Sequence, residues 1–520
     1  MHQRSLKMGC AVVAMALSLA ACSTPAGPTA SSTPGAGQQG GIAVIALSDE
    51  PDTLDPTVAN TFVSRVVFTS ICEKLYDTND KLNLVPQLAA ELPKISPDGL
   101  TVDIQLRKDV KFNDGTPFDA AAVKVTLDRN RTLETSSRKK ELALVESVKV
   151  LNESAVRLHL SRPSSPLGAQ LADRAGAIMS PTALGKLGND FGTDPVCVGP
   201  FTFKDRVAGS EINVVKSKYY YDADKVHLDG VTYKFITDPN IRAANLRSGD
   251  VNAAERLNAS DVPQLKADSK LKILDTATIA YYALDINVDP TKSANPLAKS
   301  AELRKAFELS LNRKAINDVV FAGQNVVDCV PLSMQTSLRP KNIDCSLFDP
   351  DAARAVLKKS GEKLPIRVAL TVPARPTDQK IAEVVAQMAG EVGFDISIKP
   401  VEFVSSLVAA RAGDFEMFMV GWSGRVDPDG NLTNLVTTGG SNTFSQLKDA
   451  KLDQLVADAA SATTADDRRN LYAKVLDRLA DVRADIYLYH DTWFLGTTGI
   501  QGVGYSADAI PRFKTAELTK

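Results

Sequence analysis

The sequence predicts an α/β protein of at least two lobes. Its 520 residues exceed what one hydrophobic core usually organises, so more than one core is expected. Residues 366–399 read as strand, helix and strand. Ile366 to Val372 alternates in polarity, the apolar residues of the next segment share one helical face, and Phe394 to Lys399 is again strand-like. A unit of this length predicts two parallel strands with a right-handed crossover.

The N-terminus predicts export and lipid attachment. Arg4 and Lys7 precede an apolar run, Met8 to Ala20, that is too short to span a bilayer comfortably, and a cysteine follows at position 22. This order is typical of a secretory signal peptide covering residues 1–21 and not of a transmembrane helix. The sequence Leu-Ala-Ala-Cys resembles the bacterial lipobox, which implies that Cys22 is acylated and anchors the protein. Plain secretion is the alternative.

Residues 22–40 are expected to form a flexible tether behind the lipid. Ser23 to Gly40 consists almost entirely of Ser, Thr, Pro, Ala, Gly and Gln, a composition that cannot build a packed core. No later stretch reaches 18 consecutive apolar residues, so the mature protein is predicted to be extracytoplasmic and anchored to the cell membrane by its lipid alone. The net charge of −2 gives no indication of nucleic-acid binding.

Four cysteines remain after the signal peptide and Cys22. An even number outside the cytoplasm predicts two disulfides, for which three pairings are possible. Proximity in sequence favours Cys329–Cys345, which leaves Cys72–Cys197; buried free thiols are the alternative. The chain has no Cys-x-x-Cys and few histidines, so no metal site is expected.

Capping and alternation locate several other elements. Thr101 to Leu106 alternates as a half-buried strand, and Asp119 is expected to cap a helix that runs to about Leu133. Residues 211–236 switch repeatedly between apolar and polar and are expected to form sheet.

Three further helices have recognisable beginnings. Asp349 followed by Pro350 predicts a helix that ends at Gly361. Thr377 is expected to cap the helix of the strand–helix–strand unit, and Thr464 to cap the long helix that follows it.

The sequence lacks the common catalytic motifs. It contains no Gly-x-Ser-x-Gly, no His-Glu-x-x-His, no phosphate-binding Gly-x-x-x-x-Gly-Lys-[Ser/Thr], and no Gly-x-Gly-x-x-Gly after a strand. Only His159, His227 and His490 follow Cys22, and His159 lies in an apparent strand, where a structural role is the simpler interpretation. We therefore predict that the chain is not an enzyme and needs no cofactor.

Several blocks resemble the large extracellular solute-binding proteins of ABC importers, the oligopeptide/dipeptide/nickel family (family 5). The blocks occur in the family's order and cover about residues 42–510. They are Leu54-Asp55-Pro56, Leu84 to Arg129, Gly199-Pro200-Phe201, Leu303 to Phe307 with Asn312-Arg313, Asp349 to Leu357, and Gly421 to Asp429.

The resemblance implies a type II periplasmic-binding-protein fold, in which two α/β lobes surround a ligand cleft and an extra subdomain sits on the first lobe. It assigns residues 41–72, 206–282 and 495–520 to the first lobe, 73–205 to the extra subdomain and 283–494 to the second lobe. Tyr281 and Trp493 are then expected near two strands that cross between the lobes.

The resemblance also implies a function. A protein of this family captures a small ligand, here peptide-like or anionic, by closure of its lobes and delivers it as a monomer to the permease subunits of an ABC importer. A lipid-anchored sensor or chaperone without transport, an extracellular hydrolase, and a binder of metal or metallophore are the alternatives.

One departure from the family bears on the ligand. Peptide-binding members place an acidic residue after the tryptophan–small–glycine stretch, where it meets the amino group of the ligand. Here Arg425 follows that stretch, and Asp427 is the nearest carboxylate. Because a guanidinium favours carboxylate or phosphate groups, we expect Arg425 to hold an anionic group of the ligand; an internally paired arginine is the alternative.

The other candidate ligand-binding residues lie in loops or near the crossing strands. Trp422 and Trp493 are the only tryptophans and are interpreted as walls of the cleft, with core positions as the alternative. The remaining candidates, predicted from position alone, are Asn60, Thr61, Phe62, Tyr281, Met334, Ser423, Ser441 and Asn442.

Overall fold

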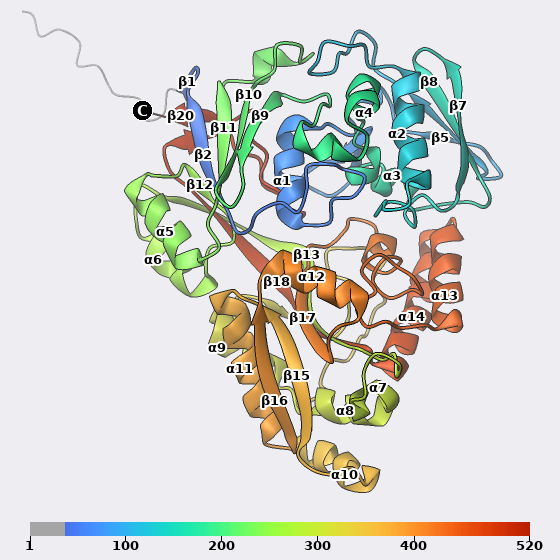
Figure 1. Ribbon diagram of the computed structural model, residues 1–520, viewed down its shortest axis with the longest axis vertical. Helices are drawn as coiled ribbons and strands as arrows, with labels where there is room; N and C mark the ends of the chain where they lie inside the picture. The colour runs from blue at the N-terminus through green and yellow to red at the C-terminus, as the bar shows by residue number, and fades with distance from the viewer. Residues whose placement is uncertain (1–36, 520) are drawn as a thin grey trace, which may run out of the picture. The chain divides into compact units, whose positions relative to one another are not determined.

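The computed structural model describes residues 37–519. The predicted signal peptide, Cys22 and most of the predicted tether lie outside these residues. Among the described residues, no helix has both the length and the apolar character needed to cross a bilayer. The described part of the chain contains an eleven-stranded mixed sheet that runs through both lobes and three smaller sheets (Figure 1).

The first lobe is organised around the N-terminal strand β2 and the buried helix α1. Its elements are β1 (Gly37–Gln38), β2 (Ile42–Leu47), α1 (Phe62–Ile71), β9 (Phe201–Val207), β10 (Glu211–Lys216), η3 (Ala223–Lys225), β11 (Gly230–Phe235), α5 (Pro239–Ser248), β12 (Ala253–Ala254), η4 (Ala259–Asp261), α6 (Val262–Lys266), β19 (Ile500–Gln501) and β20 (Glu517–Thr519). β2 lies between β11 and β12 and runs parallel to both. Nearly every side chain of α1 is buried, so this helix forms part of the core.

The extra subdomain is a four-stranded antiparallel sheet with a helix against it. Its elements are β3 (Tyr76–Thr78), β4 (Leu84–Pro86), β5 (Lys94–Ile95), β6 (Thr101–Gln105), α2 (Ala120–Thr132), β7 (Val145–Asn152), β8 (Ala155–Leu160), α3 (Leu167–Gln170), η1 (Arg174–Gly176), α4 (Pro181–Leu187) and η2 (Gly188–Thr193). As predicted, Asp119 caps α2, accepting a hydrogen bond from the Ala122 amide. The expected boundary after residue 205 falls within β9, whose pairing with β10 places it in the large sheet.

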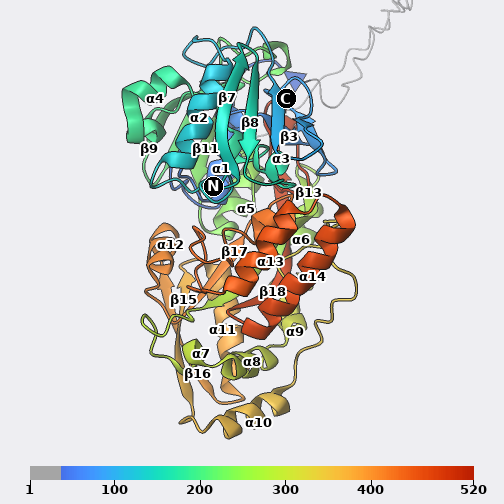
Figure 2. The same ribbon diagram turned by 90° about the vertical axis from the view of Figure 1, so that its right-hand side faces the viewer.

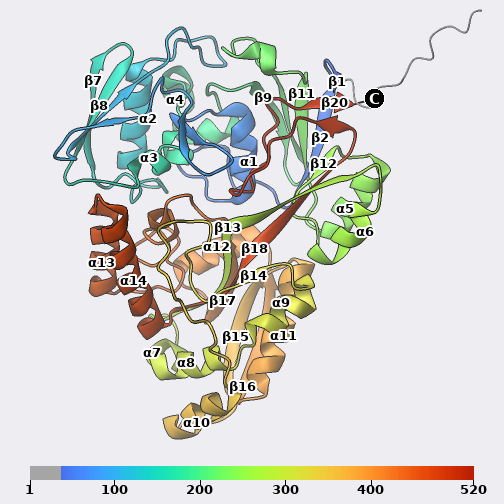
Figure 3. The same ribbon diagram turned by 180° about the vertical axis from the view of Figure 1, so that it is seen from behind.

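Two long strands cross between the lobes and pair with each other. β13 (Lys272–Ile286) and β18 (Asp485–Thr497) are antiparallel, with Lys272 opposite Thr497 at one end and Asp285 opposite Asp485 at the other. β18 also pairs with β12 of the first lobe. The two strands run side by side from one lobe into the other (Figures 1 and 3), so the expected lobe boundaries at residues 282 and 494 both fall inside them.

The second lobe contains the strand–helix–strand unit. Its elements are α7 (Pro296–Lys299), α8 (Ala301–Leu309), α9 (Arg313–Phe321), β14 (Val326–Val327), α10 (Pro350–Ser360), β15 (Ile366–Pro373), α11 (Pro376–Gly390), β16 (Phe394–Val401), α12 (Phe403–Ala412), β17 (Met417–Trp422), η5 (Pro428–Asn431), α13 (Ala450–Ser461) and α14 (Ala465–Val482). The predicted parallel pair is confirmed, since β15 and β16 are parallel neighbours, and β17 lies on the other side of β15. β17 in turn joins this group to β13.

Most of the predicted helix beginnings are confirmed, with one exception. Asp349 caps α10 through the Ala352 amide, and Thr464 caps α14 through the Asp467 amide. The prediction that Thr377 caps α11 is wrong. The N-cap is Arg375 and the helix begins at Pro376, two residues earlier than predicted, because proline at the first helical position has its φ angle already set and needs no amide donor.

The lobes also touch away from the crossing strands, where α13 lies below the extra subdomain (Figure 2). The backbone amide of Ser165 donates to the carbonyl of Ala460 at 3.0 Å. Asp173 of the subdomain forms ion pairs with Arg65 of α1 at 3.2 Å and with Arg425 of the second lobe at 2.7 Å. Burial acts to raise the pKa of Asp173, but the neighbouring guanidinium charges outweigh it and hold the pKa well below its ordinary value. This cluster joins three segments that are distant in sequence.

Asp429 lies in the same contact between the lobes. Its side chain is almost fully buried, and its Oδ2 accepts a hydrogen bond from Gln170 of the subdomain at 3.3 Å. Burial, together with the negative charge of Asp427, raises the pKa of Asp429 to about 7, although the Thr433 hydroxyl opposes the shift. The protonation of one side chain at this contact therefore changes near neutral pH.

Two disulfides are present. Cys72 is joined to Cys197 across 125 residues, and Cys329 is joined to Cys345 across 16 residues. These are the two pairs that proximity in sequence favours. The first ties the end of α1 to the segment before β9, and so links the first lobe to the far end of the extra subdomain.

We expect the longer disulfide loop to contribute more stability. By chain entropy, replacing Cys72 and Cys197 by alanine should lower the free energy of unfolding by about 5 kcal/mol, and replacing Cys329 and Cys345 by about 3 kcal/mol. Urea denaturation of the two double variants and of the unmodified protein measures the difference. Equal losses in both variants would contradict the expectation.

We also expect Asp429→Asn to reduce the pH dependence of stability. The pKa of Asp429 is raised from 3.8 to about 7 in the folded state, so the protonated side chain adds to the free energy of unfolding. This added stability is complete below pH 3.8 and is lost as the pH rises through about 7. At about 1.4 kcal/mol per pKa unit, the free energy of unfolding should fall by about 2–3 kcal/mol more in the unmodified protein than in the variant between roughly pH 5 and pH 8.5. Chemical denaturation at a series of pH values measures both free energies of unfolding. Equal pH dependence in the two proteins would refute the expectation.

Candidate functional site

The lobes enclose a cavity at the carboxyl ends of their parallel strands. It has a volume of about 720 Å³ and is lined from both lobes. In the first lobe, Ser48 and Asp49 follow β2, and Arg256 comes shortly after β12. In the second lobe, Arg375 follows β15 and Phe403 follows β16. Ligands of open α/β sheets bind outside the carboxyl ends of the strands, so this cavity, called the cleft below, is the candidate site.

Most of the predicted ligand-binding residues line the cleft. They come from the N-terminus of α1, the end of β17, the loop before α13 and the crossing strand β18. The predicted residues that the structure brings together here are Asn60, Thr61, Phe62, Trp422, Ser423, Asn442 and Trp493. Both tryptophans of the chain are therefore walls of the same cavity.

An arginine lies on the aromatic wall of the first lobe. Phe62 and Trp493 meet edge to face with ring centres 4.7 Å apart. The guanidinium of Arg256 lies 3.8 Å from the ring centre of Trp493 and 4.7 Å from that of Phe62. Its backbone has a φ angle of +48°, a region that costs energy for residues other than glycine. Within the described chain, Arg256 forms no ion pair, so aromatic faces are the main neighbours of its charge.

Arg375 occupies the middle of the cleft between two carboxylates. Its Nη2 is 3.5 Å from Oδ2 of Asp49, and its Nε is 3.6 Å from Oδ2 of Asp378. Both distances exceed those of a tight charge-assisted hydrogen bond, about 2.7–2.9 Å. Burial raises the pKa of both aspartates, and Arg375 opposes this. Burial acts to lower the pKa of Arg375, but the two carboxylates outweigh it and the pKa is raised.

A third arginine enters the cleft from α12. Nε and Nη2 of Arg411 donate to the same oxygen, Oδ1 of Asn442, at 3.2 and 3.1 Å. Burial lowers the pKa of Arg411, and Asp52 only partly offsets the effect from a distance. Among the described residues no carboxylate forms an ion pair with it. Arg411 thus presents a cation that a neutral amide side chain orients.

Several buried polar atoms around the cleft have no hydrogen-bond partner within the described chain. They include Nε of both Arg256 and Arg375, which also line an adjoining cavity of about 790 Å³. In that adjoining cavity, Oδ2 of Asp378, Nδ2 of Asn325 and the Tyr489 hydroxyl are likewise unpaired. Buried polar groups are nearly always paired in native proteins. Their gathering here indicates a surface prepared for polar groups of a ligand.

Arg425 is not in the cleft lining. Its Nε is 2.7 Å from Oδ2 of Asp173, and its Nη1 donates to the carbonyl of Gly424 at 2.7 Å. The guanidinium also lies 4.2 Å from the ring centre of Trp422. The structure therefore favours the internally paired arginine over one that holds the ligand, because its charge is already neutralised by a buried carboxylate.

The other predicted residues also lie outside the cleft lining. Asp427 receives two hydrogen bonds from Arg468, at 2.6 and 2.8 Å, so it is a structural carboxylate. Tyr281 is buried against Tyr487 with ring centres 5.2 Å apart. Met334 is 66% exposed. Ser441 is adjacent to the lining residue Asn442, but its own buried hydroxyl is not in the cleft wall.

A larger cavity of about 1130 Å³ lies where the first lobe, the extra subdomain and the second lobe meet. Several of its charged side chains pair with one another. Lys74 pairs with Asp77 at 2.7 Å, and Arg512 pairs with Asp508 at 2.6 Å. Arg65, Arg174 and Arg425 of its wall gather around Asp173, the cluster that connects the lobes.

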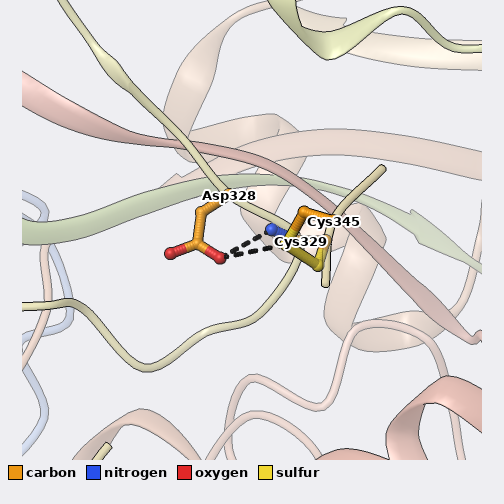
Figure 4. A group of neighbouring side chains, drawn as sticks. All are labelled: Asp328, Cys329 and Cys345. Atoms are coloured by element: carbon orange, nitrogen blue, oxygen red, sulfur yellow. Dashed lines mark hydrogen bonds between the residues drawn. A yellow bond between two sulfur atoms is a disulfide. The ribbon is translucent and has the colours of Figure 1, made fainter. Parts of the chain in front are cut away.

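One group of potential metal ligands contains Asp328, Cys329 and Cys345 (Figure 4). The two sulfurs are bonded to each other, so neither is a thiolate, which is the form that binds metal. Asp328 pairs with Arg339 at 2.7 Å and lies 3.3 Å from Nε2 of His490. With its disulfide formed, this group is a cross-link beside a buried ion pair.

The three arginines of the cleft were not predicted from the sequence. The position of Arg375 in the sequence could have predicted it as a site residue. It lies just after the first strand of the predicted strand–helix–strand unit, at the edge where ligands of such sheets bind. Arg256 and Arg411 had no comparable local signal. Among the described residues neither forms an ion pair with a carboxylate, and this is a property of the folded chain.

Comparison with known proteins places the chain in a family. Residues 83–443 match the sequence model of the bacterial extracellular solute-binding proteins, family 5. The glutathione-binding protein GsiB of Pectobacterium atrosepticum is 27% identical over 503 residues, which are 92% of this chain and 94% of that protein. GsiB of Salmonella paratyphi A is 30% identical over 394 residues, covering 73% of this chain and 74% of that protein.

Solved structures share the fold. The oligopeptide-binding protein AppA of Bacillus subtilis, in complex with a nonapeptide, superposes with a TM-score of 0.85 at 23% identity, covering 93% of this chain and all of that one (100%). The binding protein AgaA of Agrobacterium tumefaciens, in complex with agropinic acid, has a TM-score of 0.81 at 24% identity and covers 92% of this chain and 98% of that one. The two-lobed fold agrees with the match of residues 83–443 to the family model, and that match shows that the chain belongs to the bacterial extracellular solute-binding proteins of family 5.

Proposed function

We propose that this protein is the extracytoplasmic binding subunit of an ABC importer and captures a small, peptide-like anion in the cleft. The observation that carries the proposal is the set of cationic side chains that both lobes contribute to one cavity: Arg256 from the first lobe, and Arg375 and Arg411 from the second. The same cavity is also lined by aromatic side chains, among them Phe62, Trp422 and Trp493, as small-molecule sites commonly are.

Closure of the lobes explains how binding is coupled to delivery. A ligand that touches both lobes stabilises the closed arrangement by the contacts that only this arrangement provides. The crossing strands β13 and β18 allow the lobes to move as bodies while remaining joined by one sheet. Closure also excludes water, which strengthens the interaction between the arginines and an anionic ligand. A permease that recognises the closed form then receives loaded protein selectively.

The relatives support a peptide-like ligand. The two relatives described above, which match over 94% and 74% of their length, are named glutathione-binding proteins. Glutathione is a small peptide with two carboxylates and one ammonium group, a charge pattern that suits a cavity with three arginines and the aspartates Asp49 and Asp491. Because nothing in the cleft arranges a nucleophile and a base around a reacting bond, we infer capture and not turnover.

Binding is testable with the intrinsic fluorescence of the protein, because both of its tryptophans line the cleft. We expect glutathione or a related small acidic peptide to change this emission with a saturable dependence on concentration. Trp422→Phe and Trp493→Phe variants locate the signal. Native mass spectrometry of the same protein identifies any molecule that purifies with it.

Three outcomes separate the proposal from its alternatives. Saturable binding without loss of the peptide supports it, whereas cleavage of the bound peptide favours a hydrolase. Failure of all tested acidic and neutral peptides to bind refutes the peptide-like class. Retention of nickel, with no peptide, favours a metal-binding role.

We also propose that Cys22 carries the lipid that anchors the protein, on the basis of the basic, apolar and lipobox-like segments that precede it. We expect the unmodified protein to incorporate radiolabelled palmitate and to sediment with membranes. The Cys22→Ser variant should do neither. A Cys10→Ser variant is the matched control, because this cysteine lies inside the predicted signal peptide. Membrane retention of Cys22→Ser at the unmodified level would contradict the proposal.

A further inference from the structure

The arginines of the cleft differ in how their charges are compensated. Arg375 has two aspartates close by, at 3.5 and 3.6 Å. Within the described residues, Arg256 and Arg411 form no ion pair with any carboxylate, although both line the cleft. They come from opposite lobes, Arg256 from the segment after β12 and Arg411 from α12.

An arginine with a structural role in this protein has its hydrogen-bond donors paired within the chain. Arg242, in the same lobe as Arg256, donates to the backbone carbonyls of Ile236, Thr237, Glu255 and Arg256 at 2.6–3.0 Å. Its donors are used within the protein. Arg256 instead has a buried Nε without a partner and rests on the faces of Phe62 and Trp493. The stacked position holds the guanidinium plane in place and leaves its donors for another group.

Arg411 is held in a comparable way on the other side of the cleft. Two of its nitrogens share one oxygen of the neutral side chain of Asn442, so orientation is provided without a counter-charge. The nearest acidic influence, Asp52, is not within ion-pair distance among the described contacts. The Arg411 side chain is half-buried, so its guanidinium is partly desolvated without a paired carboxylate, a cost that an anionic group of the ligand would offset.

The acidic residues of the cleft do not form ion pairs with Arg256 or Arg411. Asp49 is directed to Arg375. Asp491 lies in the same wall as Arg256 but forms no ion pair with it among the described residues, and burial raises the pKa of Asp491 to about 6, against the charge of Arg256. Neither aspartate therefore neutralises Arg256 or Arg411 by direct contact.

We infer that the ligand carries two separate anionic groups, one bound by Arg256 of the first lobe and the other by Arg411 of the second. The inference rests on the proposed function and specifies its ligand class as a small peptide-like compound with two carboxylates. Such a compound bridges the lobes through both ends, so each anionic group contributes to closure. A ligand with one carboxylate contacts one lobe in this way and leaves the other arginine uncompensated.

The inference predicts the effect of removing one carboxylate from a ligand. The probes are matched pairs that differ by one negative charge: glutathione and its glycyl monoethyl ester, and the dipeptides Ala-Glu and Ala-Gln. The unmodified protein should bind the more acidic member of a pair about 10- to 100-fold more tightly, the value of a charge-assisted hydrogen bond. Tryptophan fluorescence or calorimetry measures the dissociation constants.

Variants assign the two carboxylates to the two arginines. Arg256→Gln and Arg411→Gln should each weaken binding of the acidic probe about 10-fold or more. In the variant that lacks the arginine for the removed carboxylate, the two members of a probe pair should bind with equal affinity. If a glutamine variant does not fold, Arg256→Lys or Arg411→Lys replaces it, because lysine keeps the positive charge and lacks the planar guanidinium. Arg247→Gln is the matched control, because Arg247 is an exposed arginine of the first lobe that pairs with Gln264.

The outcomes distinguish this inference from the proposed function. Equal affinity for both members of each pair overturns the inference and leaves peptide capture intact. If only Arg375→Gln abolishes the preference for the acidic probe, the second carboxylate belongs to Arg375 and the inference also fails. If no probe binds, acidic or neutral, the peptide-like class is refuted and the inference with it. A preference that is lost in Arg256→Gln or Arg411→Gln, and kept in Arg247→Gln, supports it.

Discussion

The pairing of β13 with β18 is the constraint on which the rest of the architecture depends. These two strands are hydrogen-bonded to each other along nearly their whole length, and each is also hydrogen-bonded to the sheet of one lobe, β18 to β12 and β13 to β17. The two lobes are therefore parts of one continuous sheet and cannot separate without breaking its backbone ladder. Rotation about the paired strands remains possible, and it changes the distance between the carboxyl ends of the parallel strands on either side. The cleft lies at those ends, so the same pairing that joins the lobes also locates the ligand.

Arginines with a structural role differ from those available to a ligand in whether a carboxylate pairs with them. Arg425 has a buried carboxylate at 2.7 Å, and Arg468 binds Asp427 through two hydrogen bonds. In the cleft, Arg256 rests on aromatic rings and Arg411 on an amide, neither of which carries an opposite charge. Both side chains are half-buried, so each guanidinium is partly desolvated without a paired carboxylate, a cost that binding of an anion would offset. Arg425, which was expected to hold an anionic group of the ligand, instead belongs to the cluster around Asp173 that connects the lobes.

The parts of the fold that were predicted correctly depend on neighbours in sequence. Asp119 and Asp349 cap helices because the hydrogen bond joins residues three positions apart, and the parallel strands β15 and β16 follow from the polarity pattern of one continuous segment. The site was predicted less completely. Trp422 and Trp493 were identified as walls of the cleft, yet Arg425, only three residues beyond Trp422, proved to be paired internally. Its partner Asp173 is some 250 positions away, and no local pattern connects the two.

The sequence by itself determined the class of protein: the ordered blocks and the strand–helix–strand unit identify a two-lobed solute-binding fold, because such patterns depend on residues that are close along the chain. It also contained the cysteines whose spacing favours the observed disulfides. Only the tertiary structure decided which charged residues line the cleft. Arg256, Arg375 and Arg411 come from three distant segments, and whether each finds a carboxylate depends on how the lobes are packed. An ion pair depends on the distance between two charges in space and not on their separation along the chain, which is why the charges of the cleft became visible only in the folded protein.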